Sequence, residues 1–300
     1  MDIRKTAKKI KTMEVRGAGN IARTAALALK TYTAASEEKT SEEFILGLRS
    51  AGDTLISARP TAVSLPNAVR FIRRRAEDSK LSPAQLKEHA ATAADEFINE
   101  SKAAVKTIGE IGSRRISDGD VILTHCNSQA ALSVIKTAYG QGKDIEVFAT
   151  ETRPKKQGNI TVRDLAKEGI PVTLIVDSAV RVFIKDIDKV IVGADSISVN
   201  GAVVNKIGTS QLALVAHESR KLFFVAAESY KFHPATVLGE LIEIEERNLK
   251  EVANPGDFKG VKIRNPAFDV TPPEYVDLII TERGVMPPQA AIMLIKELFG

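Results

Sequence analysis

The chain has 300 residues, which is enough for one large domain or two smaller ones. Hydrophobic residues make up 44% of it and charged residues 27%, as in an ordinary globular protein, and the formal net charge is +4. Basic and acidic residues are interspersed, and aromatic residues amount to only 5%. The composition therefore favours small anionic ligands over a nucleic acid.

The sequence carries a single cysteine, which excludes an internal disulfide framework and favours an intracellular, cytoplasmic location. The N-terminus lacks the apolar region of a signal peptide, and no apolar run approaches the roughly 20 residues that span a bilayer. We therefore expect a soluble protein that does not insert into a membrane. The four histidines are scattered, and no Cys/His spacing is typical of a metal site.

The first third of the sequence predicts helices. Ala, Lys, Glu and Leu dominate residues 20–50 and 83–116, where apolar positions recur at helical spacing. Pro83 stands where a proline is favoured at the start of a helix. Residues 59–67 contain two prolines and predict a loop or a helix junction.

The pattern changes after the turn at residues 117–120. Short β-branched runs then alternate with helical stretches, which predicts a parallel sheet covered by helices. Most of the runs are apolar throughout, as in strands buried on both faces. The predicted strands are residues 121–124, 145–150, 172–176, 190–192, 222–226 and 276–280, and the helices between them include 129–139, 161–168 and 209–219. We assign residues 1–115 to a helical N-terminal domain and residues 116–300 to a Rossmann-like α/β domain, with the boundary near 112–119.

A polar cluster follows each predicted strand. Ligands of open parallel sheets bind outside the carboxyl ends of the strands, so these clusters should converge on one rim. They are residues 124–128, 151–154, 177–178, 193–196, 228–231 and 281–284.

Cys126 lies between a predicted strand and a predicted helix. The macrodipole at a helix N-terminus favours a thiolate, which can act as a nucleophile or a general base. A lone cysteine can equally be a small buried apolar residue, and its position leaves both interpretations open.

Asp195 follows an apolar strand through Gly193 and Ala194. An apolar setting favours the protonated form of a carboxyl group, which can then act as a general acid. The alternative is an aspartate that caps a helix or stabilises a turn.

Several segments could bind phosphate. A glycine-rich turn lets backbone N–H groups approach an anion, and an arginine beside it adds a bidentate charge. Such a turn precedes the first alanine-rich helix, although a simple helix-start turn is the alternative, and without a preceding strand it is not a dinucleotide fingerprint. The candidates are Arg16-Gly17-Ala18-Gly19, Arg59, Asn205-Lys206 and Lys231, and each separate cation could also be a solvated surface charge.

Seven segments, taken in order, resemble one superfamily. They are Arg16-Gly17-Ala18-Gly19, residues 59–67, Thr124-His125-Cys126-Asn127-Ser128, Gly193-Ala194-Asp195-Ser196, Asn200-Gly201, Asn205-Lys206-Ile207-Gly208-Thr209 and Tyr230-Lys231-Phe232. The superfamily contains the regulatory subunits of the exchange factor for translation initiation factor two, methylthioribose-1-phosphate isomerase and archaeal ribose-1,5-bisphosphate isomerase. The resemblance extends from about residue 10 to the C-terminus, and residues 265–277 and 281–284 are particularly similar to the bisphosphate isomerases.

The resemblance implies catalysis. The isomerases carry a cysteine and an aspartate at the positions of Cys126 and Asp195, whereas the regulatory subunits generally lack this pair. The implied reaction converts α-D-ribose 1,5-bisphosphate to D-ribulose 1,5-bisphosphate in nucleoside monophosphate degradation or salvage. Asn127 departs from the histidine that bisphosphate isomerases favour, and Thr-His-Cys-Asn also occurs in methylthioribose-1-phosphate isomerases. That activity is one alternative, and a non-catalytic regulatory protein that binds initiation factor two is the other.

Our hypothesis for the reaction gives the two residues different roles. Asp195 protonates the ring oxygen as the C1–O4 bond breaks, and the Cys126 thiolate removes the proton from C2. Neither a metal nor an organic cofactor is implied, and members of the family form homodimers or larger rings such as homohexamers. The implied substrate-binding residues are Arg16, Gly17, Ala18, Gly19, Arg59, Ser128, Gln129, Ala130, Asn205, Lys206 and Lys231.

Overall fold

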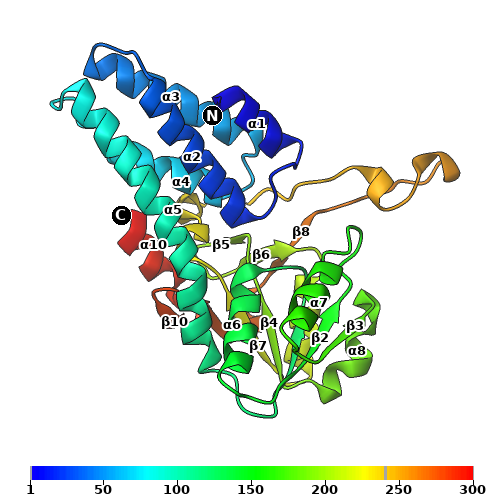
Figure 1. Cartoon of the computed structure of the whole chain (residues 1–300). Coiled ribbons are helices and arrows are strands. Elements are labelled where there is room, and N and C mark those ends of the chain that lie inside the picture. The colour runs from blue at the N-terminus through cyan, green and yellow to red at the C-terminus, as the bar shows by residue number, and fades with distance from the viewer. Residues whose placement is uncertain (1, 240–241, 300) are drawn as a thin grey trace. The chain divides into compact units, whose positions relative to one another are not determined.

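The computed structural model describes residues 2–239 and 242–299 and divides into two compact units, Met1–Ala103 and Ala104–Gly300 (Figure 1). The first unit is helical, as the sequence predicts. Its helices are α1 (Ile3–Lys11), α2 (Ala18–Ala35), α3 (Ser41–Ala58), α4 (Ser64–Arg74) and the first two-thirds of α5 (Pro83–Ser113).

Local sequence signals set the helix ends of this unit. The Thr40 hydroxyl accepts from the Glu43 amide at 3.2 Å, and the Glu43 carboxylate accepts from the Thr40 amide at 3.2 Å, so a capping box starts α3. Pro83 is the first residue of α5, which confirms the predicted start. The predicted junction at residues 59–67 is also confirmed, because α4 begins within it and holds Pro66 in its first turn, where a proline is tolerated.

Helix α5 belongs to both units. The compact units divide after Ala103, inside the helix, whereas the helix itself ends at Ser113. The end of α5 lies within residues 112–119, where we expect the domain boundary, whereas the compact units divide earlier, after Ala103.

The second unit is built on a seven-stranded sheet with the order β10-β9-β7-β4-β1-β2-β3. The pairings from β9 through to β3 are all parallel, as predicted, and only β10 runs antiparallel to its neighbour. The strands are β1 (Val121–Thr124), β2 (Glu146–Thr150), β3 (Val172–Ile175), β4 (Lys189–Val192), β7 (Leu222–Ala226), β9 (Leu278–Thr281) and β10 (Gly284–Met286).

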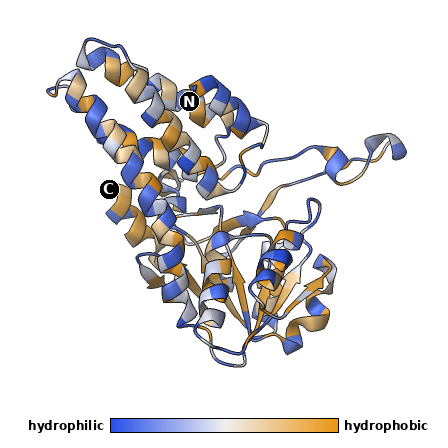
Figure 2. Cartoon of the chain, in the orientation of Figure 1, coloured by the Kyte–Doolittle hydropathy of each residue, from blue (hydrophilic) through white to orange (hydrophobic). Residues whose placement is uncertain are grey.

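Hydrophobic side chains bury both faces of this sheet, and its strands are correspondingly apolar in Figure 2. Consecutive residues enter opposite clusters: Ile122 lies in one and Leu123 in the other, as the two-residue period of a strand requires. The edge strand β3 is an exception to the expected burial of strands on both faces, because its Leu174 is 46% exposed. The helices of this unit are α6 (Gln129–Gly140), α7 (Gly158–Lys167), α8 (Val180–Phe183), α9 (Thr209–Glu218) and α10 (Ala291–Phe299).

A second, antiparallel sheet was not predicted. It has the order β5-β6-β8 and consists of β5 (Ser196–Ile197), β6 (Val203–Lys206) and β8 (Phe268–Thr271). Strand β5 has only two residues, and β6 pairs with β8 across a long stretch of chain, with Asn205 opposite Asp269. Short strands and distant pairing leave little local pattern in the sequence.

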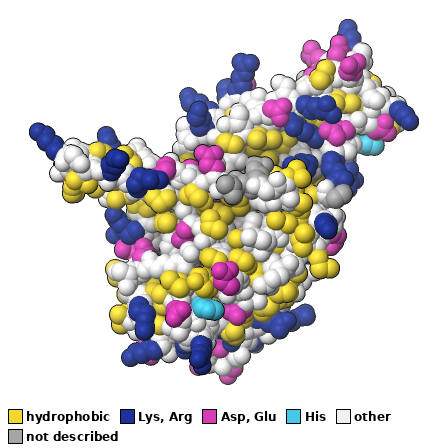
Figure 3. Space-filling model, turned by 180° about the vertical axis from the view of Figure 1, so that it is seen from behind, with side chains coloured by type: hydrophobic (Ala, Val, Ile, Leu, Met, Phe, Trp, Pro, Cys, Tyr) yellow, Lys and Arg dark blue, Asp and Glu magenta, His cyan; other side chains and the backbone are white. Residues whose placement is uncertain are grey.

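Residues 243–266 form an arm that leads into β8, drawn in yellow and orange in Figure 1. Two backbone hydrogen bonds close its base: the Arg247 amide donates to the Asn265 carbonyl at 2.9 Å, and the Ala267 amide donates to the Glu245 carbonyl at 2.8 Å. Figure 3 shows hydrophobic and basic side chains together along the arm, where Phe258 is 46% exposed. Across residues 2–239 and 242–299, none of the helices combines the length and apolar character that crossing a bilayer requires.

Candidate active site

Cys126 and Asp195 follow β1 and β4, the neighbouring strands at which the strand order reverses. The chain runs from β1 to β2 and β3 on one side, then returns to place β4 on the other side of β1. The crevice at such a switch point is the usual ligand site of an open α/β sheet. Because the six predicted strands are parallel, their carboxyl ends share one edge, and the predicted rim is confirmed.

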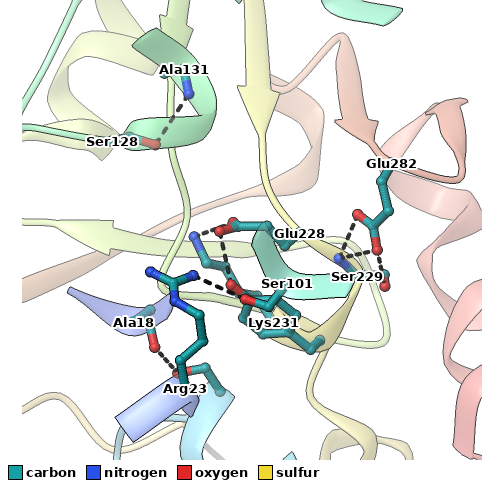
Figure 4. A network of polar contacts seen from close by, with 11 residues as sticks. Ala18, Arg23, Ser101, Ser128, Ala131, Glu228, Ser229, Lys231 and Glu282 are labelled. Carbon is teal, nitrogen blue, oxygen red and sulfur yellow. Dashed lines mark hydrogen bonds and ion pairs between the residues drawn. The ribbon is translucent and has the colours of Figure 1, made fainter. Parts of the chain in front are cut away.

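The ends of β1 and β4 approach each other closely through Ser128 and Gly193. The Ser128 hydroxyl caps α6 by accepting from the Ala131 amide at 3.3 Å (Figure 4). A Cβ atom on Gly193 would lie 2.3 Å from this hydroxyl oxygen, so only glycine fits there. Gln129 and Ala130 form the first turn of α6, whose backbone N–H groups can bind an anion.

The backbone of Cys126 is held in a left-handed conformation, with φ of 66°. Its amide donates to the Thr152 hydroxyl at 2.9 Å, and its carbonyl accepts from the Thr161 hydroxyl at 2.7 Å. Such a conformation costs about 1–3 kcal/mol in a residue other than glycine and is concentrated at functional sites. The two threonines therefore fix the backbone of Cys126, and with it the direction of the Cys126 side chain.

Thr152 is itself strained, with φ of 62°. Its amide and that of Arg153 both donate to the Asp177 carboxylate, each at 2.7 Å. The loops after β1, β2 and β3 are thus joined in sequence, from Cys126 through Thr152 to Asp177. The sequence placed all three residues in strand-end clusters, but the order of these contacts could not be predicted.

His125, the residue before Cys126, is held by hydrogen bonds of both ring nitrogens. Its Nε2–H donates to the Ile207 carbonyl at 2.9 Å, and its Nδ1 lies 2.6 Å from the Thr150 hydroxyl, which donates to it. Burial lowers the pKa of His125, so the imidazole is neutral. Gly208, at φ of 104°, lies against the ring, where a Cβ would come within 3.0 Å of it. His125 therefore positions the turn after β6 beside Cys126.

The ionisation of Cys126 corrects an expectation from the sequence. Burial raises the pKa of the thiol to about 11, although Lys206, the Asn127 amide and Arg247 lower it, and Asp195 raises it further. Desolvation of the thiolate therefore outweighs the favourable helix N-terminus. Cys126 keeps its proton at neutral pH in the ligand-free chain, and it senses the charge of Asp195.

Lys206 is buried rather than a solvated surface charge. Its ammonium donates to the Ala267 carbonyl at 3.0 Å and lies 4.8 Å from the centre of the Phe268 ring. Burial lowers the pKa of Lys206 and Arg247 lowers it further, while the carboxyl groups of Asp195 and Glu245 raise it. Neighbouring Asn205 is buried as well, and its amide donates to the Thr209 hydroxyl at 3.0 Å.

Lys231, another predicted phosphate ligand, forms a buried ion pair with Glu228 at 2.6 Å (Figure 4). Burial raises the pKa of Glu228, but the Lys231 charge and hydrogen bonds from Lys231 and Tyr230 outweigh burial and lower it. Glu228 is therefore ionised and holds the Lys231 side chain in one orientation.

The remaining candidates belong to the helical unit. Arg16 is exposed, and its Nε donates to the Met13 carbonyl at 3.0 Å. Gly17, at φ of 80°, is the N-cap of α2, whose first turn contains Ala18 and Gly19. The Ser64 hydroxyl donates to the Ala18 carbonyl at 2.9 Å and so joins the starts of α2 and α4. Arg59 is the C-cap of α3. A role for these residues in the site stays a prediction.

Asp269 is a further residue of the site that sequence analysis missed. Its carboxylate accepts from the Gly208 amide at 2.7 Å and from the Ser210 amide at 3.1 Å, at the start of α9. Burial raises the pKa of Asp269 to about 6, against the effect of these hydrogen bonds and of Lys206. Within residues 2–239 and 242–299, no three His, Cys, Asp or Glu side chains form a group that could hold a metal ion.

Fold and site together define an α/β protein with a helical N-terminal unit and a thiol–carboxylate pair at the switch point of its sheet. The chain belongs to the initiation factor 2 subunit family, whose model matches residues 14–288.

Three relatives illustrate the range of this family. The chain is 60% identical over 299 residues to a ribose 1,5-bisphosphate isomerase of Methanocaldococcus jannaschii, covering 99% of this chain and 96% of the relative. It is 39% identical to a methylthioribose-1-phosphate isomerase of Geobacter sulfurreducens, covering 95% and 87%. A solved structure of translation initiation factor eIF-2B from Pyrococcus horikoshii OT3 superposes with a TM-score of 0.82 at 33% identity, covering 97% and 98%.

Proposed function

We propose that the chain converts α-D-ribose 1,5-bisphosphate to D-ribulose 1,5-bisphosphate, as an intramolecular aldose–ketose isomerase. The observation that carries this proposal is the Cys126–Asp195 pair at the switch point of a chain so similar to a ribose 1,5-bisphosphate isomerase. The pair supplies one acid and one base, which is what an isomerisation without net proton uptake needs.

The reaction requires a protonated Asp195 and an ionised Cys126. Burial raises the pKa of the Cys126 thiol in the ligand-free chain, so Cys126 must lose its proton before it can act as the base. The C1 phosphate prevents ordinary opening of the sugar to an aldehyde, and Asp195 must therefore protonate O4 as the C1–O4 bond breaks. Cys126 removes the C2 proton to give a cis-phosphoenolate and returns it to C1, while the C2 hydroxyl proton goes back to Asp195.

Phosphate binding is proposed for several residues. The first turn of α6 offers its backbone N–H groups beside Cys126, and Lys206 offers a buried ammonium group. The glycine turn before α2 and Arg59 are further phosphate ligands that the family resemblance implies. The proposed ligands are Arg16, Gly17, Ala18, Gly19, Arg59, Ser128, Gln129, Ala130, Asn205, Lys206 and Lys231.

Substitution of the pair tests the proposal. Cys126→Ser and Asp195→Asn should each lower kcat by at least about 100-fold, the usual scale of general acid–base catalysis. Arg59→Ala should mainly raise KM, because it removes a binding contact. Formation of ribulose 1,5-bisphosphate, followed by chromatography, provides the rate. Near-normal turnover by either variant of the pair would contradict the mechanism.

A second candidate activity is methylthioribose-1-phosphate isomerisation, which the 39% identity to such an enzyme favours. Its chemistry at C1 and C2 would use the same pair, but its substrate carries a thioether in place of the second phosphate. Parallel incubations with the two sugars decide between them: exclusive turnover of methylthioribose 1-phosphate would replace the main proposal. Turnover of neither sugar, combined with binding to initiation factor two, would favour a regulatory protein.

We also propose a metabolic role, a location and an assembly for the chain. We place the reaction in AMP metabolism, in the cytoplasm, and expect the chain to assemble as a homodimer or homohexamer. Structures of multimeric family members, such as a tetrameric eIF2B complex of C. thermophilum at 21% identity, share its fold. Light scattering coupled to size-exclusion chromatography measures the assembly directly.

A further inference from the structure

Arg247 lies at the base of the arm and is held there by specific contacts. Its side chain is only 8% exposed, its Nε donates to the Glu245 carboxylate at 3.2 Å, and its guanidinium lies 5.8 Å from the centre of the Phe268 ring. The Lys206 ammonium lies 4.8 Å from the centre of the same ring. Two cations that come from distant parts of the chain therefore share one aromatic side chain.

The base of the arm is braced on both sides. The Glu246 carboxylate accepts from the Asn265 amide at 2.8 Å and pairs with Arg264, which holds the two segments of the base together. Glu251 pairs with Lys155 at 3.0 Å and so joins the arm to the loop that contains Thr152. These contacts fix the position of Arg247 relative to the Cys126 loop.

Charged groups face Cys126 from several elements. Lys206 comes from β6, Asp195 follows β4 and Arg247 comes from the arm, and the charge of each acts on the thiol. On its own segment, His125 is buried and neutral between the Thr150 hydroxyl and the Ile207 carbonyl. Asp177 is directed away, because its carboxylate accepts from the amides of the Thr152 loop. Two cations and one carboxylate therefore act on the thiol, while Glu245 pairs with Arg247 and Asp269 interacts with Lys206.

We propose that Arg247 is a positioning residue for the Cys126–Asp195 pair: from the base of the arm, its guanidinium joins Lys206 on Phe268 and adds a second cation that favours the thiolate form of Cys126. The inference rests on the proposed acid and base roles of this pair. It gives the arm, which follows strands β1 to β7 in the chain, a role in the ionisation of Cys126, the proposed general base.

The thiol itself reports the result, because Cys126 is the only cysteine of the chain. The rate of alkylation by iodoacetamide, measured against pH without substrate, follows the thiolate fraction. Arg247→Gln should raise the apparent thiol pKa by about one unit, the scale of one neighbouring charge, and slow alkylation about 10-fold at any pH below it. Arg247→Lys should keep the wild-type profile. Lys259→Gln removes an exposed lysine of the same arm that has no part in these contacts, and it should leave the profile unchanged.

Arg247→Met provides a second neutral variant that retains an apolar contact with Phe268, and near-UV circular dichroism identifies folded protein. Wild-type alkylation profiles in both neutral variants would overturn the proposal even if turnover fell, because Arg247 would then act on the substrate. A slower profile in Lys259→Gln as well would also overturn it, because the effect would then come from the arm in general. If the wild-type chain fails to isomerise ribose 1,5-bisphosphate, the proposed function fails, whereas the alkylation result still decides the role of Arg247.

Discussion

The carboxyl group of Asp269 provides a quantitative test of the electrostatics around α9. It is mostly buried and accepts two backbone N–H groups, and its pKa is about 6 in the folded chain against 3.8 for an ordinary aspartate. Because the pKa is higher in the folded state, that state binds the proton more tightly than the unfolded chain. The stabilisation by this proton is complete below pH 3.8 and is lost as the pH rises through about 6.

The size of the effect follows from the two pKa values. Their difference of about 2 units corresponds to about 3 kcal/mol of stabilisation that is present at low pH and lost at neutral pH. Between pH 4.5 and pH 8 the loss is about 2 kcal/mol. Asp269 retains some exposure, so screening by water reduces the value, and we expect about 1–2 kcal/mol. Asp269→Asn keeps the shape and one acceptor but cannot titrate, so this part of the pH dependence should disappear.

Urea unfolding of both proteins at pH 4.5 and pH 8 gives four free energies of unfolding. The relevant quantity is the change in the wild-type free energy between the two pH values minus the same change for Asp269→Asn. This double difference cancels the cost of the altered hydrogen bonds and the titration of all other groups. The wild type should lose about 1–2 kcal/mol more than the variant on going to pH 8. Equal pH dependence in the two proteins would refute the argument that burial of Asp269 outweighs its hydrogen bonds.

Three further predictions concern the active-site loops. The pKa of the Cys126 thiol is about 11 instead of 9.0, so at neutral pH its thiolate fraction should be about 100-fold lower than that of an ordinary cysteine. Iodoacetamide should react with it correspondingly slowly, and a rate equal to that of a free thiol would contradict this. Thr152→Val removes the acceptor of the Cys126 amide and should lower the free energy of unfolding by about 1–3 kcal/mol, measured in urea, whereas Thr152→Ser retains the acceptor and should stay near wild type. Gly193→Ala places a Cβ 2.3 Å from the Ser128 hydroxyl and should cost about 1–3 kcal/mol, and Ser128→Gly in the same chain should recover most of it; no recovery would show that the clash lies elsewhere.

Much of the fold could be predicted from local sequence patterns. Pro83 and the apolar repeat after it specify the start of α5, and continuous apolar runs specify strands that are buried on both faces, such as β1 and β4. The positions of Cys126 and Asp195 at strand ends followed from the same runs. Helical and strand periodicity, proline and polar strand ends act over a few residues, so the sequence displays them directly.

The tertiary structure alone decided how the site is held and charged. The sheet β5-β6-β8 pairs Asn205 with Asp269, and this pairing buries Lys206 beside Cys126, where sequence analysis allowed a surface charge. Burial then keeps Cys126 protonated in spite of the helix N-terminus, and the arm brings Arg247 to the same place. These properties depend on desolvation and on charges from segments far apart in the chain. The sequence by itself places Cys126 and Asp195 at strand ends, whereas the packing of distant segments determines the ionisation of Cys126.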